Sequence, residues 1–260
     1  MRQETADARK ARRGRRNSLL AALPRAEYQR LLAGLEPVAL EFGVVLKESG
    51  APIRHVYFPI GCVVALLTLV EGHKPLQAGL VGNEGMVGMP LALGIQVSSH
   101  RALVQVAGTA MRMKASDFRR EFLQSKPLQQ AIYRYKHALT GQFVQAIVCN
   151  KFHSLRARFA RYLLMTADRA RSREIRLTHE FLARMLGVRR PGITSAAGAL
   201  EKNKLIQCGR GKITILDRKR LGATSCACYR IINRMYRKAR TRMADSARKR
   251  KRGMGGASAA

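Results

Sequence analysis

The hydrophobic positions change their spacing along the chain, and these changes divide it into segments. Between residues 40 and 114, short apolar and β-branched runs such as 44–46, 56–58 and 102–106 are separated by glycine and proline. Short runs at such even spacing predict a compact antiparallel barrel or jelly roll. From 19 to 35 the apolar residues return at helical spacing, which predicts short helices that cover this barrel.

The spacing becomes that of a helix near residue 127 and stays so to residue 150. The apolar positions that define it are Leu128, Ile132, Tyr135, Leu139, Phe143 and Ile147. We predict one long amphipathic helix whose stripe resembles a two-helix seam, so that it pairs with the same helix of a second subunit. The alternative is that the stripe packs against the chain's own barrel. Residues 154–168 predict a further helix that leads into the next segment.

Residues 177–215 carry the most specific pattern of the chain. Thr178 can cap a helix through its hydroxyl, and Gly187 can adopt the left-handed conformation that a sharp turn requires. Pro191 suits the first turn of a second helix, and a β-prone hairpin with Arg210 at its glycine-flanked tip follows. This order is typical of a winged helix-turn-helix. The alternative is an ordinary helical hairpin with a solvated basic face.

A winged helix-turn-helix places the start of its second helix against base edges in the major groove of DNA. Arginine suits the paired acceptors of guanine, and basic residues of the wing suit phosphate. The residues that we predict to contact DNA are Thr178, Arg189, Arg190, Gly192, Thr194, Ser195, Lys202, Arg210 and Lys212.

The composition favours double-stranded DNA as the partner. The 260 residues include 49 Lys and Arg against 16 Asp and Glu, a formal net charge of +33 that calls for a polyanion. The longest apolar run, 62–70, is far shorter than the ~20 residues of a membrane helix. No export signal is evident, and five cysteines suit a reducing compartment. We therefore expect a cytoplasmic, nucleoid-associated protein with no membrane partner.

Patterns that would indicate catalysis or metal binding do not occur at a useful spacing. We find no paired carboxylates, metal triad, nucleophile elbow or phosphate-binding glycine loop in the sequence, so we do not expect an enzyme. Cys226 and Cys228 are a close pair, but no histidine or third cysteine lies near them in the sequence. We therefore predict inert thiols and no metal site.

The barrel, long helix and winged helix-turn-helix, in this order, resemble the Crp/Fnr family of bacterial transcription regulators. The resemblance covers roughly residues 31–229. Its most specific pieces are LTHEFLARMLGVRRPGITSAAGALEKNKLI, HVYFPIGCVVALL, and GLVGNEGMVGMPLALG with the downstream HRALVQV. It implies an α+β fold: an N-terminal antiparallel β jelly-roll of the cyclic-nucleotide-binding type, a long dimerisation helix and a C-terminal winged helix-turn-helix. It also implies a homodimer that binds a palindromic operator and contacts RNA polymerase.

The resemblance further implies that the barrel senses an effector. Cyclic-nucleotide-binding members keep a phosphate-binding cassette where this chain has residues 82–94, with Gly88 before a short helix and Arg101 as the phosphate contact. The acidic residue that would hold the ribose is replaced by Met89, and Glu84 stands five residues too early. We therefore expect no cyclic AMP binding in the usual mode, no cofactor, and at most an unidentified small effector. A surface or salt-bridged Arg101 is the favoured alternative to a phosphate contact.

We accordingly predict five segments. They are a basic disordered arm (1–18), an effector-sensing-like β-barrel (19–124), a dimerisation helix (125–151), a winged helix-turn-helix DNA-binding domain (152–228) and a basic C-terminal tail (229–260). Between 229 and 252 the chain has eleven basic residues against the single acid Asp245, although the apolar residues at 231–236 could make an amphipathic helix. The function that we predict is a sequence-specific transcription regulator. The alternative is an architectural or non-specific nucleic-acid-binding protein dominated by its basic tails.

Overall fold

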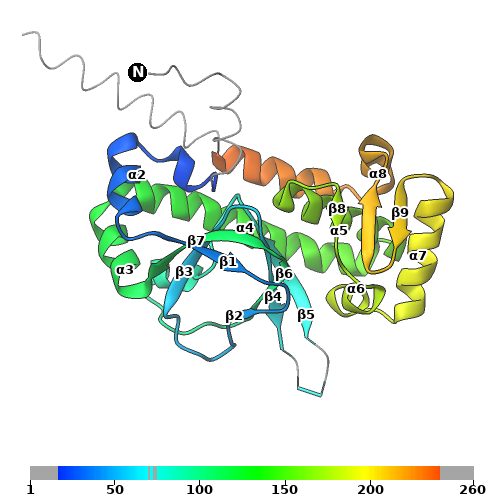
Figure 1. Cartoon of the computed structure of the whole chain (residues 1–260), viewed down its shortest axis with the longest axis horizontal. Helices are drawn as coiled ribbons and strands as arrows, with labels where there is room; N and C mark the ends of the chain where they lie inside the picture. The colour runs from blue at the N-terminus through cyan, green and yellow to red at the C-terminus, as the bar shows by residue number, and fades with distance from the viewer. Residues whose placement is uncertain (1–16, 70, 73–74, 241–260) are drawn as a thin grey trace, which may run out of the picture.

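The computed structural model describes residues 17–69, 71–72 and 75–240 (Figure 1). The predicted basic arm before residue 17 and the part of the predicted tail after residue 240 lie outside these residues. In Figure 1 the β-barrel fills the left of the view, and a smaller unit of helices α5–α8 and strands β8–β10, which we call the head domain, fills the right.

The barrel consists of two antiparallel sheets with strand orders β1–β7–β3 and β2–β6–β4–β5. Alternate residues of both sheets, such as Val56 and Phe58 on one and Val64 and Val104 on the other, meet in one fully buried core. The predicted antiparallel jelly roll is confirmed. The strand bounds are β1 Glu36–Leu40, β2 Val45–Lys47, β3 His55–Pro59, β4 Val63–Thr68, β5 Leu76–Val81, β6 Arg101–Val106 and β7 Gly108–Lys114.

Short helices cover the barrel, and one long helix runs along it toward the head domain. The bounds are η1 Leu20–Ala22, α2 Arg25–Leu32, η2 Met89–Leu93, α3 Ala115–Gln124 and α4 Lys126–Phe152. Helix α4 begins where Ser125 accepts a hydrogen bond from the Leu128 amide, with proline in the first turn, where its missing N–H costs no hydrogen bond.

The apolar stripe of α4 faces the barrel of its own chain. Leu128, Ile132, Tyr135 and Leu139 are all buried in the barrel core, and Phe143 packs against it. Only Ile147, at 71% exposure, lies outside this contact. The prediction that this stripe forms a seam with a second subunit is therefore wrong for these residues, because the barrel already covers them.

The head domain has the predicted helix-turn-helix and wing. Its bounds are α5 Leu155–Ala170, β8 Glu174–Ile175, α6 His179–Leu186, α7 Arg190–Lys202, β9 Ile206–Gly209, β10 Lys212–Ile215 and α8 Arg218–Thr224. The strand order is β8–β10–β9, and β10 pairs antiparallel with both neighbours.

The head domain and the barrel share a hydrophobic core across strand β4. Val64 and Leu66 point into the barrel, whereas Val63, Ala65 and Leu67 point into the core of the head domain. A strand that is covered on both faces needs apolar residues at successive positions, which explains the uninterrupted run seen in the sequence.

Within the described residues, the chain continues after α8 as a further helix. Residues 228–240 are helical and lie along α4 and α5 (Figure 1, orange). Ile232 is fully buried in the core of the head domain, and a Cβ added to Gly141 of α4 would lie 2.4 Å from the sulfur of Met235. The predicted basic tail therefore starts with a packed amphipathic helix, and Gly141 permits its close approach to α4.

The guanidinium of Arg169 on α5 contacts the barrel, α4 and the final helix. Its side chain is 4% exposed, and its Nε lies 2.8 Å from Glu84 Oε1 of the barrel. Its Nη2 donates to Gln142 Oε1 of α4 at 2.9 Å, and the group stacks 5.3 Å from the ring centre of Tyr236. Burial lowers the pKa of Arg169, whereas the Glu84 carboxylate raises it, and the net change is an increase. The barrel, α4, α5 and the final helix thus meet at one buried charge.

We predict that Arg169→Met lowers the free energy of unfolding by about 3–5 kcal/mol, because it leaves the Glu84 carboxylate buried without its cation. The matched control is Arg101→Met, which removes an exposed ion pair with Glu48. That change should cost less than about 1 kcal/mol. Urea denaturation measures both values. Equal losses in the two variants would contradict the role assigned to Arg169.

Candidate nucleic-acid interface

The turn between α6 and α7 has the geometry that the sequence requires. Thr178 caps α6 by accepting a hydrogen bond from the Phe181 amide at 3.1 Å. Gly187 has a φ of +64°, and the Val188 amide closes the turn on the Ala183 carbonyl at 3.0 Å. A residue with a side chain is disfavoured at this φ, so glycine fixes the angle between the two helices.

The amino end of α7 lies in solvent. Ile193, Ala197 and Leu200 are buried in the head domain, which leaves the opposite face of the helix outside. Arg189 at the N-cap and Arg190 in the first turn are both exposed. The two arginines that we expect to reach base edges are therefore available at the end of the helix that a major groove would receive.

The smaller predicted contact residues of α7 divide between two faces. Ser195 and Thr194 are exposed, and Thr194 Oγ1 lies 3.2 Å from Nδ1 of His179 on α6. Gly192 is half-buried, and a Cβ there would lie 3.0 Å from Leu155 of α5. Gly192 thus faces α5, which corrects its predicted place on the outer surface. The sequence did not indicate His179 as a neighbour of the predicted contact residues. A histidine in the first turn of a helix is common, and its position beside α7 follows only from the fold.

The wing and the end of α7 present the remaining predicted cations. Arg210 is exposed in the turn between β9 and β10, and Lys202 is exposed in the last turn of α7. Lys212 is exposed, but its Nζ lies 2.7 Å from Glu174 Oε2. Hydrogen bonds from Lys212 and then Arg176 hold the pKa of Glu174 below its ordinary value. Lys212 would therefore have to exchange one anionic partner for another on binding phosphate.

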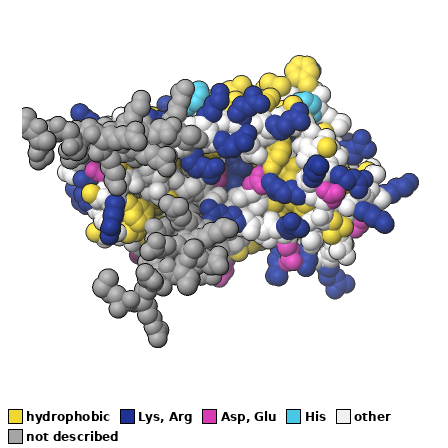
Figure 2. All heavy atoms as spheres, turned by 90° about the horizontal axis from the view of Figure 1, so that it is seen from above, with side chains coloured by type: hydrophobic (Ala, Val, Ile, Leu, Met, Phe, Trp, Pro, Cys, Tyr) yellow, Lys and Arg dark blue, Asp and Glu magenta, His cyan; other side chains and the backbone are white. Residues whose placement is uncertain are grey.

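Basic side chains are widespread on the molecule. Lys and Arg spread over much of the face that Figure 2 shows, with few acidic side chains among them. A hollow of about 500 Å³ between α6 and α7 is lined in part by Arg184, Arg189 and Arg190. This distribution provides attraction toward a polyanion around the exposed end of α7.

The three predicted effector residues do not form a common site. Glu84 is paired with Arg169, and Arg101 Nε lies 2.7 Å from Glu48 Oε2 on the barrel surface. Gly88 has a φ of +102° and packs against Val56, and a short helix follows it as expected. The favoured alternative, a salt-bridged Arg101, is what the structure has. Since both charged groups are engaged in separate ion pairs, we do not propose an effector site there.

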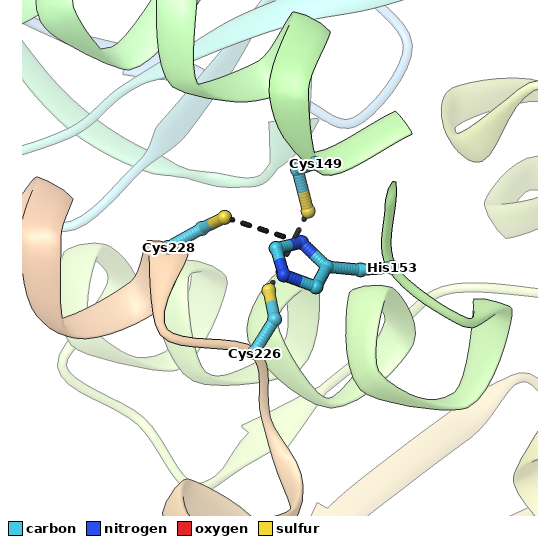
Figure 3. A group of neighbouring side chains, drawn as sticks. All are labelled: Cys149, His153, Cys226 and Cys228. Atoms are coloured by element: carbon cyan, nitrogen blue, oxygen red, sulfur yellow. Dashed lines mark hydrogen bonds between the residues drawn. The ribbon is translucent and has the colours of Figure 1, made fainter. Parts of the chain in front are cut away.

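A further cluster was not foreseen from the sequence. Cys226 and Cys228 lie beside Cys149 and His153 of the long helix, so the close pair does have a histidine and a third cysteine near it (Figure 3). The sequence did not indicate this cluster, because 77 positions separate Cys149 from Cys226.

No helix within the described residues is both long enough and apolar enough to cross a membrane.

Comparison with known proteins identifies the head domain and the fold. Residues 157–224 match the family described as the Crp-like helix-turn-helix domain. A search of curated proteins found no match.

Solved structures similar to the whole arrangement include transcription regulators. FixK2 from Bradyrhizobium japonicum has a TM-score of 0.63 at 13% identity, and the match covers 74% of this chain and 98% of that one. The c-di-GMP responsive global regulator CLP of Xanthomonas campestris has a TM-score of 0.60 at 15% identity, over 74% and 99%. A Crp/Fnr-family transcriptional regulator from Thermus thermophilus, TTHA1359, has a TM-score of 0.53 at 21% identity, over 73% and 98%. The chain therefore has the Crp/Fnr regulator fold with a Crp-like helix-turn-helix domain.

We predict that Gly187→Ala destabilises the protein by more than about 1 kcal/mol, because alanine is strained at this φ. Its Cβ would also lie 2.7 Å from Leu76 of the barrel. Gly198→Ala is the matched control, since Gly198 lies within α7 with no atom within 4 Å of an added Cβ. It should stabilise by about 0.5–1 kcal/mol, the usual gain over glycine inside a helix. Thermal denaturation distinguishes the two signs, and a neutral Gly187→Ala would refute the turn geometry.

Proposed function

We propose that the chain is a sequence-specific DNA-binding transcription regulator of the Crp/Fnr type, without enzymatic activity, that acts as a homodimer on a palindromic operator. The observation that carries the proposal is the exposed amino end of α7, with Arg189 and Arg190 in solvent, in a domain that matches the Crp-like helix-turn-helix family. Double-stranded DNA is the partner that fits both this end and the net charge of +33.

The predicted contacts fall into two classes. Arg190, with Arg189, Thr194 and Ser195 beside it, would read base edges, because these side chains lie at the end of α7 that faces away from the head domain. Arg210 of the wing, with Thr178, Lys202 and Lys212, would bind phosphate and position the head without selecting a sequence.

The homodimer is supported by a second apolar face of α4, opposite to the one that the barrel covers. Tyr133, Val144, Ile147, Val148 and Phe152 are exposed by 39% or more and recur at helical spacing. A large apolar surface of this kind is typical of a face that another protein covers. A second copy of the chain would cover it and place two heads on one side of a duplex, about one helical turn apart.

The resemblance to Crp/Fnr regulators also makes the cytoplasmic nucleoid the expected site of action and RNA polymerase the expected protein partner. The second candidate function is a non-specific architectural protein, which the net charge of +33 favours. Selection of bound sequences separates the two candidates, because only a regulator enriches a common motif.

We predict that Arg190→Ala relaxes sequence selection. In a binding selection from random duplexes, the wild-type chain should enrich a two-fold symmetric motif, and Arg190→Ala should lose about 1–3 kcal/mol of discrimination at one position of each half-site. Arg210→Ala should keep the motif and weaken all duplexes about equally, with a shallower dependence of affinity on salt.

Arg119→Ala is the matched control for these variants, because Arg119 is an exposed arginine on α3 of the barrel, outside the head domain. It should change neither motif nor affinity. If wild-type protein enriches no motif, the regulator is excluded and the architectural function remains. If Arg190→Ala keeps every preference, base reading by the start of α7 is refuted.

We predict that Ile147→Glu prevents dimerisation, because a carboxylate buried within an apolar contact lacks a partner for its charge. Asn150→Glu is the matched control: Asn150 is exposed on the same helix but lies about a third of a turn away from the centre of the apolar face. Light scattering should give a dimer for the wild type and the control and a monomer for Ile147→Glu. A monomeric wild-type chain at micromolar concentration would count against the proposed homodimer.

A further inference from the structure

Four side chains that commonly bind metal converge at the junction between α4 and the head domain. Cys149, Cys226 and Cys228 are buried, and His153 is half-buried beside them. One donor atom from each, three Sγ and one imidazole nitrogen, lie within 4.8 Å of one another. Figure 3 shows the four side chains pointing toward a common centre from two separate parts of the chain.

Local structure explains how the four meet. Cys149 and His153 stand four positions apart, one in the last turn of α4 and one at its C-cap, so they share a face of the helix. Cys226 lies in the short connection between α8 and the final helix 228–240, and Cys228 is the first residue of that helix. The connection is held in place by the burial of Ile232 in the head-domain core. The cluster is thus preformed by packing that involves other residues.

The spacing of the donors fits a single tetrahedral ion. With metal–sulfur bonds of about 2.3 Å, the sulfur atoms of a tetrahedral zinc site lie roughly 3.8 Å apart. Here Cys149 Sγ lies 3.4 Å from Cys226 Sγ, and Cys228 Sγ lies 3.4 Å from His153 Nδ1. An iron–sulfur cluster would need its ligand sulfurs farther apart, because several atoms lie between them. All five cysteines are free thiols.

The surroundings of the cluster carry positive charge. Arg158 and Arg161 of α5 act electrostatically on Cys149, and the Nε of each is buried without a hydrogen-bond partner among the described residues. Gln145 Nε2 donates to Cys228 Sγ at 3.2 Å, as outer hydrogen bonds to metal-bound sulfur do. Three thiolates and one divalent ion carry a net charge of −1, which these guanidinium groups offset.

We propose that Cys149, His153, Cys226 and Cys228 bind one Zn²⁺ in a closed, tetrahedral structural site. Three sulfurs and one imidazole are the donors that zinc prefers, and four protein ligands leave no position open for water or substrate. On binding, each of the three thiols releases its proton to solvent, and the imidazole coordinates through its unprotonated nitrogen. The ion would fasten the start of the final helix to the end of α4, directly before Ser154, the N-cap of α5.

The first experiment uses the full-length chain, purified under reducing conditions and equilibrated with Zn²⁺. Elemental analysis should give about one zinc per chain after removal of loosely bound metal. Replacement by Co²⁺ should give the intense visible bands of tetrahedral cobalt and a thiolate-to-cobalt charge-transfer band. This spectrum needs no variant and reports the ligand set directly. An octahedral cobalt spectrum, or no bound metal, overturns the proposal.

Variants then assign the ligands. Cys228→Ser and His153→Ala should each weaken zinc binding by at least about tenfold in competition with a chromophoric chelator. Cys208→Ser is the matched control, because Cys208 is a half-buried thiol on β9 of the wing and should bind zinc like the wild type. A strong chelator should lower the melting temperature of the wild type and of Cys208→Ser by more than that of His153→Ala. Unchanged zinc affinity in the two ligand variants, or a Cys149–Cys226 disulfide in place of metal, contradicts the site.

Discussion

The position of the head domain depends on the buried guanidinium of Arg169. A charge removed from water is tolerated only where paired and hydrogen-bonded, and here the partners come from the barrel through Glu84, from α4 through Gln142 and from the final helix through Tyr236. Because each partner belongs to a different part of the chain, these three contacts form together in only one arrangement of those parts. Apolar packing across strand β4 holds the barrel and the head domain together. The contacts of Arg169 determine their relative orientation.

This arrangement has a consequence for the recognition surface. Helix α6 lies against the barrel, where the rings of Phe42 and Phe181 are 5.3 Å apart and Leu76 approaches Gly187. Arg190 follows Gly187 by three residues and is exposed, while Ile193, Ala197 and Leu200 hold α7 in the head domain. A change in the contact between barrel and head domain at Gly187 would therefore also move the start of α7.

The sequence predicted well what depends on neighbouring residues. Thr178, Gly187 and Pro191 set the ends and the turn of the two helices, and these signals are local. It failed where one pattern allowed two partners: the stripe from Leu128 to Leu139 fits a coiled coil as well as a barrel, and only the fold decides. It also missed contacts between distant segments. Cys149 and Cys226, like Glu84 and Arg169, have no sequence relation that would indicate their proximity before the chain is folded.

We propose above all that the start of α7 enters the major groove of a duplex. Protection of guanine N7 from methylation tests it directly, because N7 faces that groove. On a duplex selected by the protein, we expect protected guanines in two symmetric half-sites about one helical turn apart, and loss of that protection with Arg190→Ala. Even protection along the duplex, or protection that Arg190→Ala leaves unchanged, would contradict the account.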